Sequence, residues 1–342
     1  MAKVSTSIAI RHFRDDDLPR VLELLRSSLG GGPGGMRTAD FFRWKHLENP
    51  FGRSFALLGE ADGRLVGFRA FMRWRLSAAG TPVLAVRAVD TATHPDYQGR
   101  GIFSTLTRRS LEALRDEADL VFNTPNEKSL PGYLKMGWQI AGNVPVRVRV
   151  RRPFRFVRRI RSLHEEIDVP LEKPPISAAT AADVLAGEGS LPDLLLRTSS
   201  PDRRLATQRD LEYLRWRYGA APLLDYRVVE ESSNGRLNGV AIFRVRPRGR
   251  LWESTIAEVL VAPGDRGTAA KLLASVRDAC PVDHLTCFFP ADAAAARAAR
   301  WHGYLRVPFG MTLAVNPLSP GSDPDPRHLS SWALSLGDLE VF

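Results

Sequence analysis

The chain has 342 residues, 44% hydrophobic and 25% charged, which is typical of a soluble globular protein and excludes disorder, collagen or coiled coil as whole-chain descriptions. At about 150 residues per domain, this length favours two domains. Lys and Arg number 48 against 38 Asp and Glu, and the net charge of +10 suits an anionic partner such as a phosphorylated cofactor, nucleic acid or an acidic membrane.

The amino-terminal part of the chain predicts a strand, a helix and a hairpin. Carboxylates at Asp15–Asp17 favour the start of a helix, because the amino end of a helix carries partial positive charge. The pair Asp62-Gly63 favours a tight hairpin turn. The expected elements are, in order, a strand at Ile8–Arg11, a helix from Asp15 to Leu29, a glycine loop at Gly30–Gly35, and a hairpin of strands 54–60 and 64–74.

Three more strands and two helices follow within the first 150 residues. Alternating apolar residues indicate strands, and apolar residues at helical spacing indicate helices. The expected elements are a strand at 83–93, a helix at 102–114, a strand at 120–123, a helix at 129–135 and a strand at 144–150. This order predicts an α/β fold, a mixed sheet with flanking helices.

An internal repeat organises the chain. Phe42-Arg-Trp44-Lys matches Leu214-Arg-Trp216-Arg, and in both copies a Gly-Arg-Leu-x-Gly segment ends 23 positions after the tryptophan, at Gly67 and Gly239. Further matches follow in the same order, Ala92-Thr-His-Pro95 with Val261-Ala-Pro263 and Met136-Gly-Trp138 with His302-Gly-Tyr304. We therefore expect two copies of one domain. The expected ranges are 1–150, an arginine-rich connector at 151–165, and 166–342, whose tail from Trp332 alternates like a strand.

Several sites and locations are disfavoured. No run of about 18 apolar residues that could cross a membrane is present, and the chain starts without an apolar signal-peptide core. Cys280 and Cys287 do not form a CxxC pair, and no two of the seven histidines show a metal-ligand spacing. We expect no metal site, no disulfide framework and a cytoplasmic location.

A candidate phosphate site follows the long strand. The segment Gln98-Gly-Arg-Gly101-Ile-Phe103 leads directly into a helix. Small residues there let the backbone turn tightly and point N–H groups outward, and the positive end of the helix adds to their attraction for phosphate. The glycines fit neither the dinucleotide fingerprint nor a Walker loop, and an ordinary strand-to-helix turn has a similar sequence.

A second motif follows about 25 residues later, and the two motifs together are more specific than the first one alone. It reads Asn126-Glu-Lys-Ser129-Leu-Pro-Gly-Tyr133-Leu-Lys-Met-Gly137-Trp138. Together the two segments resemble the cofactor motifs of the GNAT superfamily of acyl-CoA N-acyltransferases, Q/R-x-x-G-x-G/A and N-x-x-A/S-x-x-x-Y-x-K-x-G-F/W. The resemblance spans roughly residues 6–145 and, more faintly, 205–310. Phe103 departs from it, since Gly or Ala is usual there.

The resemblance implies a role for each matching residue. Acetyl-CoA or another acyl-CoA would be the co-substrate. Its pyrophosphate would bind main-chain N–H groups of the loop, its pantetheine arm would bind the end of the long strand and Asn126, and Tyr133 would protonate the departing thiolate. A phenol suits that step, because with a pKa of about 10 it is protonated at neutral pH. The implied cofactor-binding residues are Thr91, Ala92, Thr93, Gln98, Gly99, Arg100, Gly101, Ile102, Phe103, Asn126 and Ser129.

The base that deprotonates the acceptor amine is not marked by either motif. Asp90 and Asp96 flank the strand and loop, with His94 between them. We place Asp90 first as a catalytic base. His94, directly before Pro95, is interpreted as a turn residue.

Other residues of interest have structural interpretations. Trp44 and Trp216 recur in both copies and are interpreted as core anchors. The second copy has Asp292 and Ala299 where the first has Asn126 and Tyr133, and its turn at Arg266 lacks an equivalent of Gly101. The second domain is therefore predicted to be a degenerate GNAT-like domain without catalysis.

The segment Arg147–Arg161 holds eight arginines and no acid. Three interpretations stay open: a solvated face plus connector, a site for an anionic acceptor, or a surface for tRNA or a membrane. Phe154, Phe156, Val157 and Ile160 are interleaved with these arginines.

The function expected from these patterns is acyl transfer from CoA to an amine, with acetyl as the expected group. Direct transfer is expected because no cysteine lies in the motif region to carry the acyl group. One alternative is an aminoacyl-tRNA-dependent transferase of the Fem type, and another is a non-catalytic module that binds acyl-CoA. The acceptor is expected to be a small-molecule amine, with its identity left open.

Overall fold

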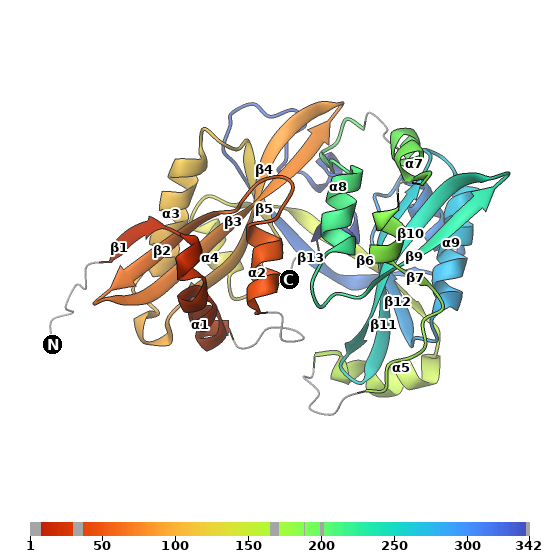
Figure 1. Ribbon diagram of the computed structural model, residues 1–342, viewed down its shortest axis with the longest axis horizontal. Helices are drawn as coiled ribbons and strands as arrows, with labels where there is room; N and C mark the ends of the chain where they lie inside the picture. Colours follow the sequence, from red (N-terminus) through yellow and green to blue (C-terminus); the bar gives the residue numbers. More distant parts are fainter. Residues whose placement is uncertain (1–7, 30–36, 165–170, 188, 199–201, 340–342) are drawn as a thin grey trace. The chain divides into compact units, whose positions relative to one another are not determined.

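The computed structural model describes residues 8–29, 37–164, 171–187, 189–198 and 202–339. The chain forms two compact units (Figure 1). The first contains the chain up to Gly142 together with Thr312–Ser331, and the second contains Asn143–Met311 and the segment that starts at Trp332. The expected glycine loop at 30–35 lies outside the described residues.

The first unit is built on a mixed sheet. Its strand order is β1-β2-β3-β4-β5-β13, and all neighbours are antiparallel except the parallel pair β4 and β5. The strands are β1 (Ala9–His12), β2 (Phe55–Ala61), β3 (Arg64–Ala78), β4 (Thr81–Thr93), β5 (Leu120–Asn123) and the end of β13 (Leu305–Pro317). The strands predicted from the sequence are confirmed, with ends shifted by a few residues.

Helices cover both faces of this sheet. They are α1 (Leu18–Leu29), α2 (Ala39–His46), α3 (Ile102–Leu114) and α4 (Leu130–Leu134). Phe68 of β3 packs in one core cluster with α1 and α2. The preceding residue, Gly67, faces α3 so closely that an added Cβ would lie 2.5 Å from Ile102 Cγ2. Since successive strand residues point to opposite faces, α1 and α2 lie on one face and α3 on the other.

The second unit repeats this plan. Its strand order is β6-β12-β11-β10-β9-β7, with β11 and β12 as the parallel pair. The strands are β6 (Gln139–Val150, from Asn143 on), β7 (Ala179–Thr180), β9 (Tyr226–Ser233), β10 (Arg236–Arg248), β11 (Leu251–Val261) and β12 (His284–Cys287), and a short β8 covers Ala206–Thr207. The helices are α5 (Pro153–Arg159), α6 (Ala181–Ala186), α7 (Leu191–Thr198), α8 (Leu211–Leu214), α9 (Arg266–Ala279), α10 (Ala294–Trp301) and α11 (Leu336–Leu339).

The units exchange their last strands, which corrects the expected domain ranges. The sheet of the first unit is completed by Ala314–Pro317 of β13, which pair with β5. The sheet of the second unit is completed by Arg147–Val150 of β6, which pair with β12. Thus the strand expected at 144–150 belongs to the second unit, and neither domain is a contiguous stretch of sequence.

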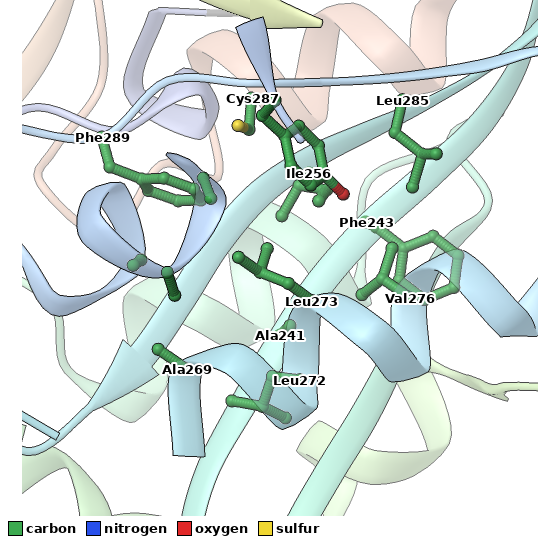
Figure 2. Packing of buried hydrophobic residues seen from close by; sticks show 14 of the residues in the cluster. Ala241, Phe243, Ile256, Ala269, Leu272, Leu273, Val276, Leu285, Cys287 and Phe289 are labelled. Atoms are coloured by element: carbon green, nitrogen blue, oxygen red, sulfur yellow. The ribbon is translucent and has the colours of Figure 1, made fainter. Parts of the chain in front are cut away.

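The core of the second unit is apolar and contains both cysteines. Figure 2 shows Ala241, Phe243 and Ile256 of the sheet packed against Leu272 and Leu273 of α9. Cys280 and Cys287 are buried in the same cluster as free thiols.

Two expectations for the second half need correction. The tail from Trp332 forms the short helix α11 rather than a strand, although its leucines are buried. The expected connector is a helical part of the second unit, in which Arg151 Nη1 donates to the carbonyls of Arg277 and Cys280 and Arg155 pairs with the buried Asp283. None of the helices in the described part of the chain is long and apolar enough to cross a bilayer.

Candidate active site

The site of the first unit begins with a bulge in β4. The register of β3 with β4 passes from Arg69–Thr91 to Ala70–Val89, so Asp90 is the extra residue. Its φ of +33° is unusual for a residue other than glycine. Such bulges turn a side chain and its neighbouring peptide groups away from the regular ladder.

Beyond the bulge, β4 and β5 separate. Their parallel pairing covers only Ala85–Leu120, Val86–Val121 and Arg87–Phe122. The strand β4 continues to Thr93 while pairing with β3 alone. Within the described residues, no strand pairs with the main chain after Arg87 on the β5 side, although the Thr93 carbonyl accepts from Ser28 Oγ at 3.1 Å. An extended ligand can pair with such an edge as an added strand does.

The segment after β4 forms a turn that exposes backbone N–H groups. Gly99 and Gly101 have φ of +74° and +78°, a conformation that only glycine adopts without strain. Gly101 caps α3 without any side-chain hydrogen bond, so the first N–H groups of this 13-residue helix have no side-chain cap from the described residues. The residues Gln98–Gly101 are exposed. This geometry fits a phosphate group.

His94 shapes the same turn from its start. Its Nδ1 accepts from the N–H of Asp96, and its Nε2 contacts Arg64 Nη2 at 3.1 Å. The side chain of Arg100 lies over the ring of Tyr97. These contacts agree with the interpretation of His94 as a turn residue.

Phe103 joins the turn to α4. Its ring lies edge-on to Tyr133, 5.5 Å between centroids, and covers Gly132, where an added Cβ would come within 3.0 Å of Phe103 Cε1. The bulky side chain at this position is thus accommodated by a glycine on α4.

Asn126 and Ser129 fix the start of α4. The Oδ1 of Asn126 accepts from the N–H of Ser129 at 2.9 Å and from its hydroxyl at 3.0 Å. Asn126 is exposed. Its amide nitrogen, which these two bonds do not involve, remains a donor at the edge of the site.

Tyr133 lies in the core between the sheet and α4. Only 3% of the residue is exposed. Its ring contacts Trp138 at 5.0 Å between centroids, in addition to Phe103. The ring is therefore fixed in orientation, and both predicted motifs meet at this one side chain.

A residue that the sequence reasoning missed, Arg69 of β3, lies in the same group. Its guanidinium carbon is 5.4 Å from the centre of the Tyr133 ring, and its Nη1 donates to the carbonyl of Val89 at 3.4 Å. Val89 directly precedes the bulge. An arginine inside the apolar run Phe68–Met72 was the available indication.

On the opposite face, Asp90 is held by two buried residues of α2. Its Oδ2 accepts from Lys45 Nζ and from His46 Nε2, each at 2.8 Å. The Nδ1 of His46 lies 2.9 Å from Ser54 Oγ. Lys45 and His46 were also missed by the sequence reasoning.

These contacts set the charge of Asp90. Burial alone would raise the pKa of the carboxyl group, but Lys45 and His46 hold it well below its usual range. Burial in turn lowers the pKa of Lys45 and of His46. Asp90 is thus a fixed negative charge and a weak base, which argues against the expected role as the proton acceptor.

In the second unit, the position that corresponds to Asp90 is covered by the carboxy-terminal tail. Glu258 stands three residues before Val261, as Asp90 stands before Thr93, and Tyr218 stands two residues after Trp216, as His46 stands after Trp44. Tyr218 donates to Glu258 at 2.9 Å. The tail packs onto this pair, since an added Cβ on Gly337 would lie 2.0 Å from the Tyr218 hydroxyl.

The second unit also lacks an open helix cap. Asp265 Oδ1 accepts from the N–H of Thr268 at the start of α9, where a phosphate would otherwise bind. Ala299 is fully buried, and Asp292 pairs with Arg204. Both tryptophans of the repeat, Trp44 and Trp216, are buried as expected. Within the described residues, no group of three or more His, Cys, Asp or Glu side chains could hold a metal ion.

Residues 9–141 match the sequence model of a family described as an acetyltransferase (GNAT) domain. The search of curated proteins found no match for this chain.

Solved structures resemble nearly the whole chain. A probable N-acyltransferase of unknown function from Enterococcus faecalis has a TM-score of 0.62 at 14% identity, over 92% of this chain and 73% of its own. A GCN5-related N-acetyltransferase from Kribbella flavida has a TM-score of 0.61 at 15% identity, over 93% and 72%. Another GCN5-related N-acetyltransferase, from Anabaena variabilis, has a TM-score of 0.61 at 10% identity, over 92% of this chain and 73% of its own. At these identities the likeness shows the fold alone.

Proposed function

We propose that this protein, whose residues 9–141 match the model of an acetyltransferase (GNAT) domain, transfers an acyl group, with acetyl as the expected group, from acyl-CoA to an amine. The observation that carries this proposal is the meeting of two motifs at Tyr133. The ring of Tyr133 touches Phe103, which belongs to the turn with the free N–H groups.

The residues of the first unit fit a CoA molecule. The turn Gln98–Phe103, of which Gln98–Gly101 are exposed, would offer main-chain donors to the pyrophosphate at the positive end of α3. Residues Thr91–Thr93 of β4, unpaired on one side, would hydrogen-bond the amides of the pantetheine arm. The free amide nitrogen of Asn126 would donate to the same arm.

The reaction is attack of the amine nitrogen on the thioester carbonyl. The new C–N bond forms, the C–S bond breaks, and the electron pair moves onto sulfur. Tyr133 would then give its hydroxyl proton to that sulfur, a step that a positioned general acid typically accelerates. A main-chain N–H at the bulge of β4 would stabilise the oxyanion.

Direct transfer is supported by the state of the cysteines. Both lie in the core of the second unit, and burial raises the pKa of Cys280 to about 11 and of Cys287 to about 12. A thiol with such a pKa is a poor nucleophile at neutral pH. An acyl-cysteine intermediate is therefore not part of the proposal.

The acceptor is proposed to be a small amine that approaches near Asp90. The side chain of Asp90 is 23% exposed, and its carboxylate stays charged. A fixed negative charge would attract the ammonium form of the acceptor, and water rather than Asp90 would carry its proton away.

The test measures thiol release with acetyl-CoA and a panel of small amines for the native protein and for Tyr133→Phe. We expect the variant to lose about two to four orders of magnitude in kcat, while acetyl-CoA binding by calorimetry stays nearly unchanged. Phe preserves the ring contacts and removes only the proton donor.

Three results would redirect the proposal. An unchanged kcat in Tyr133→Phe would remove Tyr133 as the acid. Binding of acetyl-CoA without turnover on any amine would favour the non-catalytic module. Stabilisation by aminoacyl-tRNA and not by acetyl-CoA would favour a Fem-type transferase.

A further inference from the structure

Arg69 is a buried cation whose side chain is only partly satisfied by the protein. It is 0% exposed. Its Nη1 makes one long hydrogen bond to the carbonyl of Val89, and its Nε and Nη2 are buried without a hydrogen-bond partner among the described residues. No carboxylate pairs with it in the described part of the chain.

Aromatic rings hold this guanidinium in place. Its carbon lies 4.4 Å from the ring centre of Phe71, 5.4 Å from that of Tyr133 and 5.6 Å from that of Phe103. Such rings attract a cation but do not accept its N–H donors as a carboxylate does. A guanidinium keeps its charge at any pH a protein tolerates. Its unfilled donors are therefore a place for an electron-rich ligand atom.

The position of these donors matches the reacting end of the ligand proposed above. Val89, to which Arg69 is bonded, directly precedes the bulge of β4. The ring of Tyr133, the proposed acid for sulfur, lies against the guanidinium. The site is thus bounded by the bulge on one side and by Tyr133 on the other.

The second unit supports a linked role for Arg69 and Tyr133. Ala241 stands two residues after Gly239, where Arg69 stands two residues after Gly67. Ala299 replaces Tyr133 in the same comparison, counted back from Gly303 and Gly137. Figure 2 shows Ala241 beside Leu272 and Leu273 in the apolar core of the second unit. The unit without the tyrosine also lacks the arginine, whereas Phe71 is matched by Phe243.

We propose that Arg69 is a catalytic residue that binds the sulfur of CoA and stabilises the thiolate, an inference that rests on the proposed acyl transfer. As the C–S bond breaks, its electron pair moves to sulfur, and the N–H donors of Arg69 stabilise that charge. Arg69 keeps its protons, and the proton that completes the thiol comes from Tyr133. The same contact favours ionisation of the thiol of bound CoA.

The test compares binding of CoA with binding of desulfo-CoA, which lacks the sulfur atom. The proteins are the native chain, Arg69→Met, Arg69→Lys and the control Arg87→Met. Met keeps length and packing and removes the charge. Arg87 is also buried on the sheet of this unit, stacked on Trp74 and Phe122, so its loss reports general damage to the fold.

For the native chain we expect CoA binding to tighten as the pH rises toward the pKa of the CoA thiol, and thiolate absorbance to appear at lower pH than for free CoA. Arg69→Met should bind CoA about tenfold more weakly at alkaline pH, the equivalent of one pKa unit, with desulfo-CoA binding unchanged. Arg69→Lys should retain part of the preference for CoA over desulfo-CoA, and Arg87→Met should retain all of this preference.

Equal weakening of CoA and desulfo-CoA in Arg69→Met would overturn the inference and leave acyl transfer standing. A loss of affinity in Arg69→Met that is confined to acyl-CoA with a carboxylate on the acyl chain would also overturn the inference, because Arg69 would then bind the acyl group and not the sulfur. Failure of the native chain to bind CoA at all would instead remove the proposed function. If Arg69→Met does not fold, an Arg69→Lys protein with an unshifted thiolate titration decides against the proposal.

Discussion

At Asp90, a strained backbone and a buried ion pair occur in one residue. The positive φ places the carboxylate between Lys45 and His46, which come from α2, more than 40 positions earlier in the chain. A buried ion pair often stabilises a protein no more than a pair of apolar residues would, but removal of one partner leaves a buried, unpaired charge. The cluster therefore makes the stability of the first unit depend on keeping both charges.

We predict that Asp90→Asn destabilises the protein by about 3 kcal/mol, because Lys45 is left charged and buried. Denaturant unfolding would measure this. The double variant Lys45→Met with Asp90→Asn should recover much of the loss, since no unpaired charge remains. Additive effects of the two substitutions would show that the pair does not interact.

The pH dependence of this difference has a defined sign. The pKa of Asp90 is lower in the folded protein than in the unfolded chain, so its contribution is present at neutral pH and is lost as the pH falls below about 4. Below that pH, the difference in the free energy of unfolding between the native protein and Asp90→Asn should become smaller.

The sequence identified residues that stand in local motifs and missed those defined by tertiary contacts. Tyr133 and Gly101 could be found because neighbouring positions carry the pattern. Lys45 and Arg69 could not, since a lysine on a helix and an arginine on a strand are ordinary until their partners are known. The repeat held one clue, since Arg217 occupies the position of Lys45 and is buried as well.

At the scale of elements, the helix α3 was predicted with its observed bounds, Ile102–Leu114. The reason is local: a glycine at the cap and apolar residues at helical spacing define it. The difference between α3 and α9 is equally local, because Gly101 leaves the helix end open and Asp265 fills it. This contrast supports assigning phosphate binding to the first unit only.

We predict that Gly101→Val abolishes acetyl-CoA binding, because a side chain at a φ of +78° strains the turn and covers its N–H groups. The matched control is Gly264→Val, which has a φ of +82° before α9 and equally open surroundings. Calorimetry should show native affinity for the control. Equal loss in both variants would mean that the effect is general strain.

At the scale of the molecule, the exchange of β6 and β13 was not predictable from periodicity. The strand at 144–150 alternates apolar and polar residues as expected, and such a pattern says which face is buried but not which sheet edge receives the strand. The repeat favoured contiguous domains, and the pairing of Ala314 with Asn123 shows otherwise.

We predict that a fragment of residues 1–150 does not fold stably, because the outer edge of β5 lacks its partner. Circular dichroism and thermal unfolding would show this, and a peptide of residues 305–331 added in trans should restore a cooperative transition. If the fragment alone unfolded cooperatively at the same temperature as the full chain, the prediction would be wrong.

The exchanged strands also bear on synthesis of the chain. On the ribosome, β5 emerges about 190 residues before its partner in β13, a delay of roughly 10 to 40 s at usual translation rates. During that interval the nascent first unit presents an unfinished sheet edge. Completion of the sheet in the first unit thus waits until nearly all of the second unit has been synthesised, which links the folding of the two units.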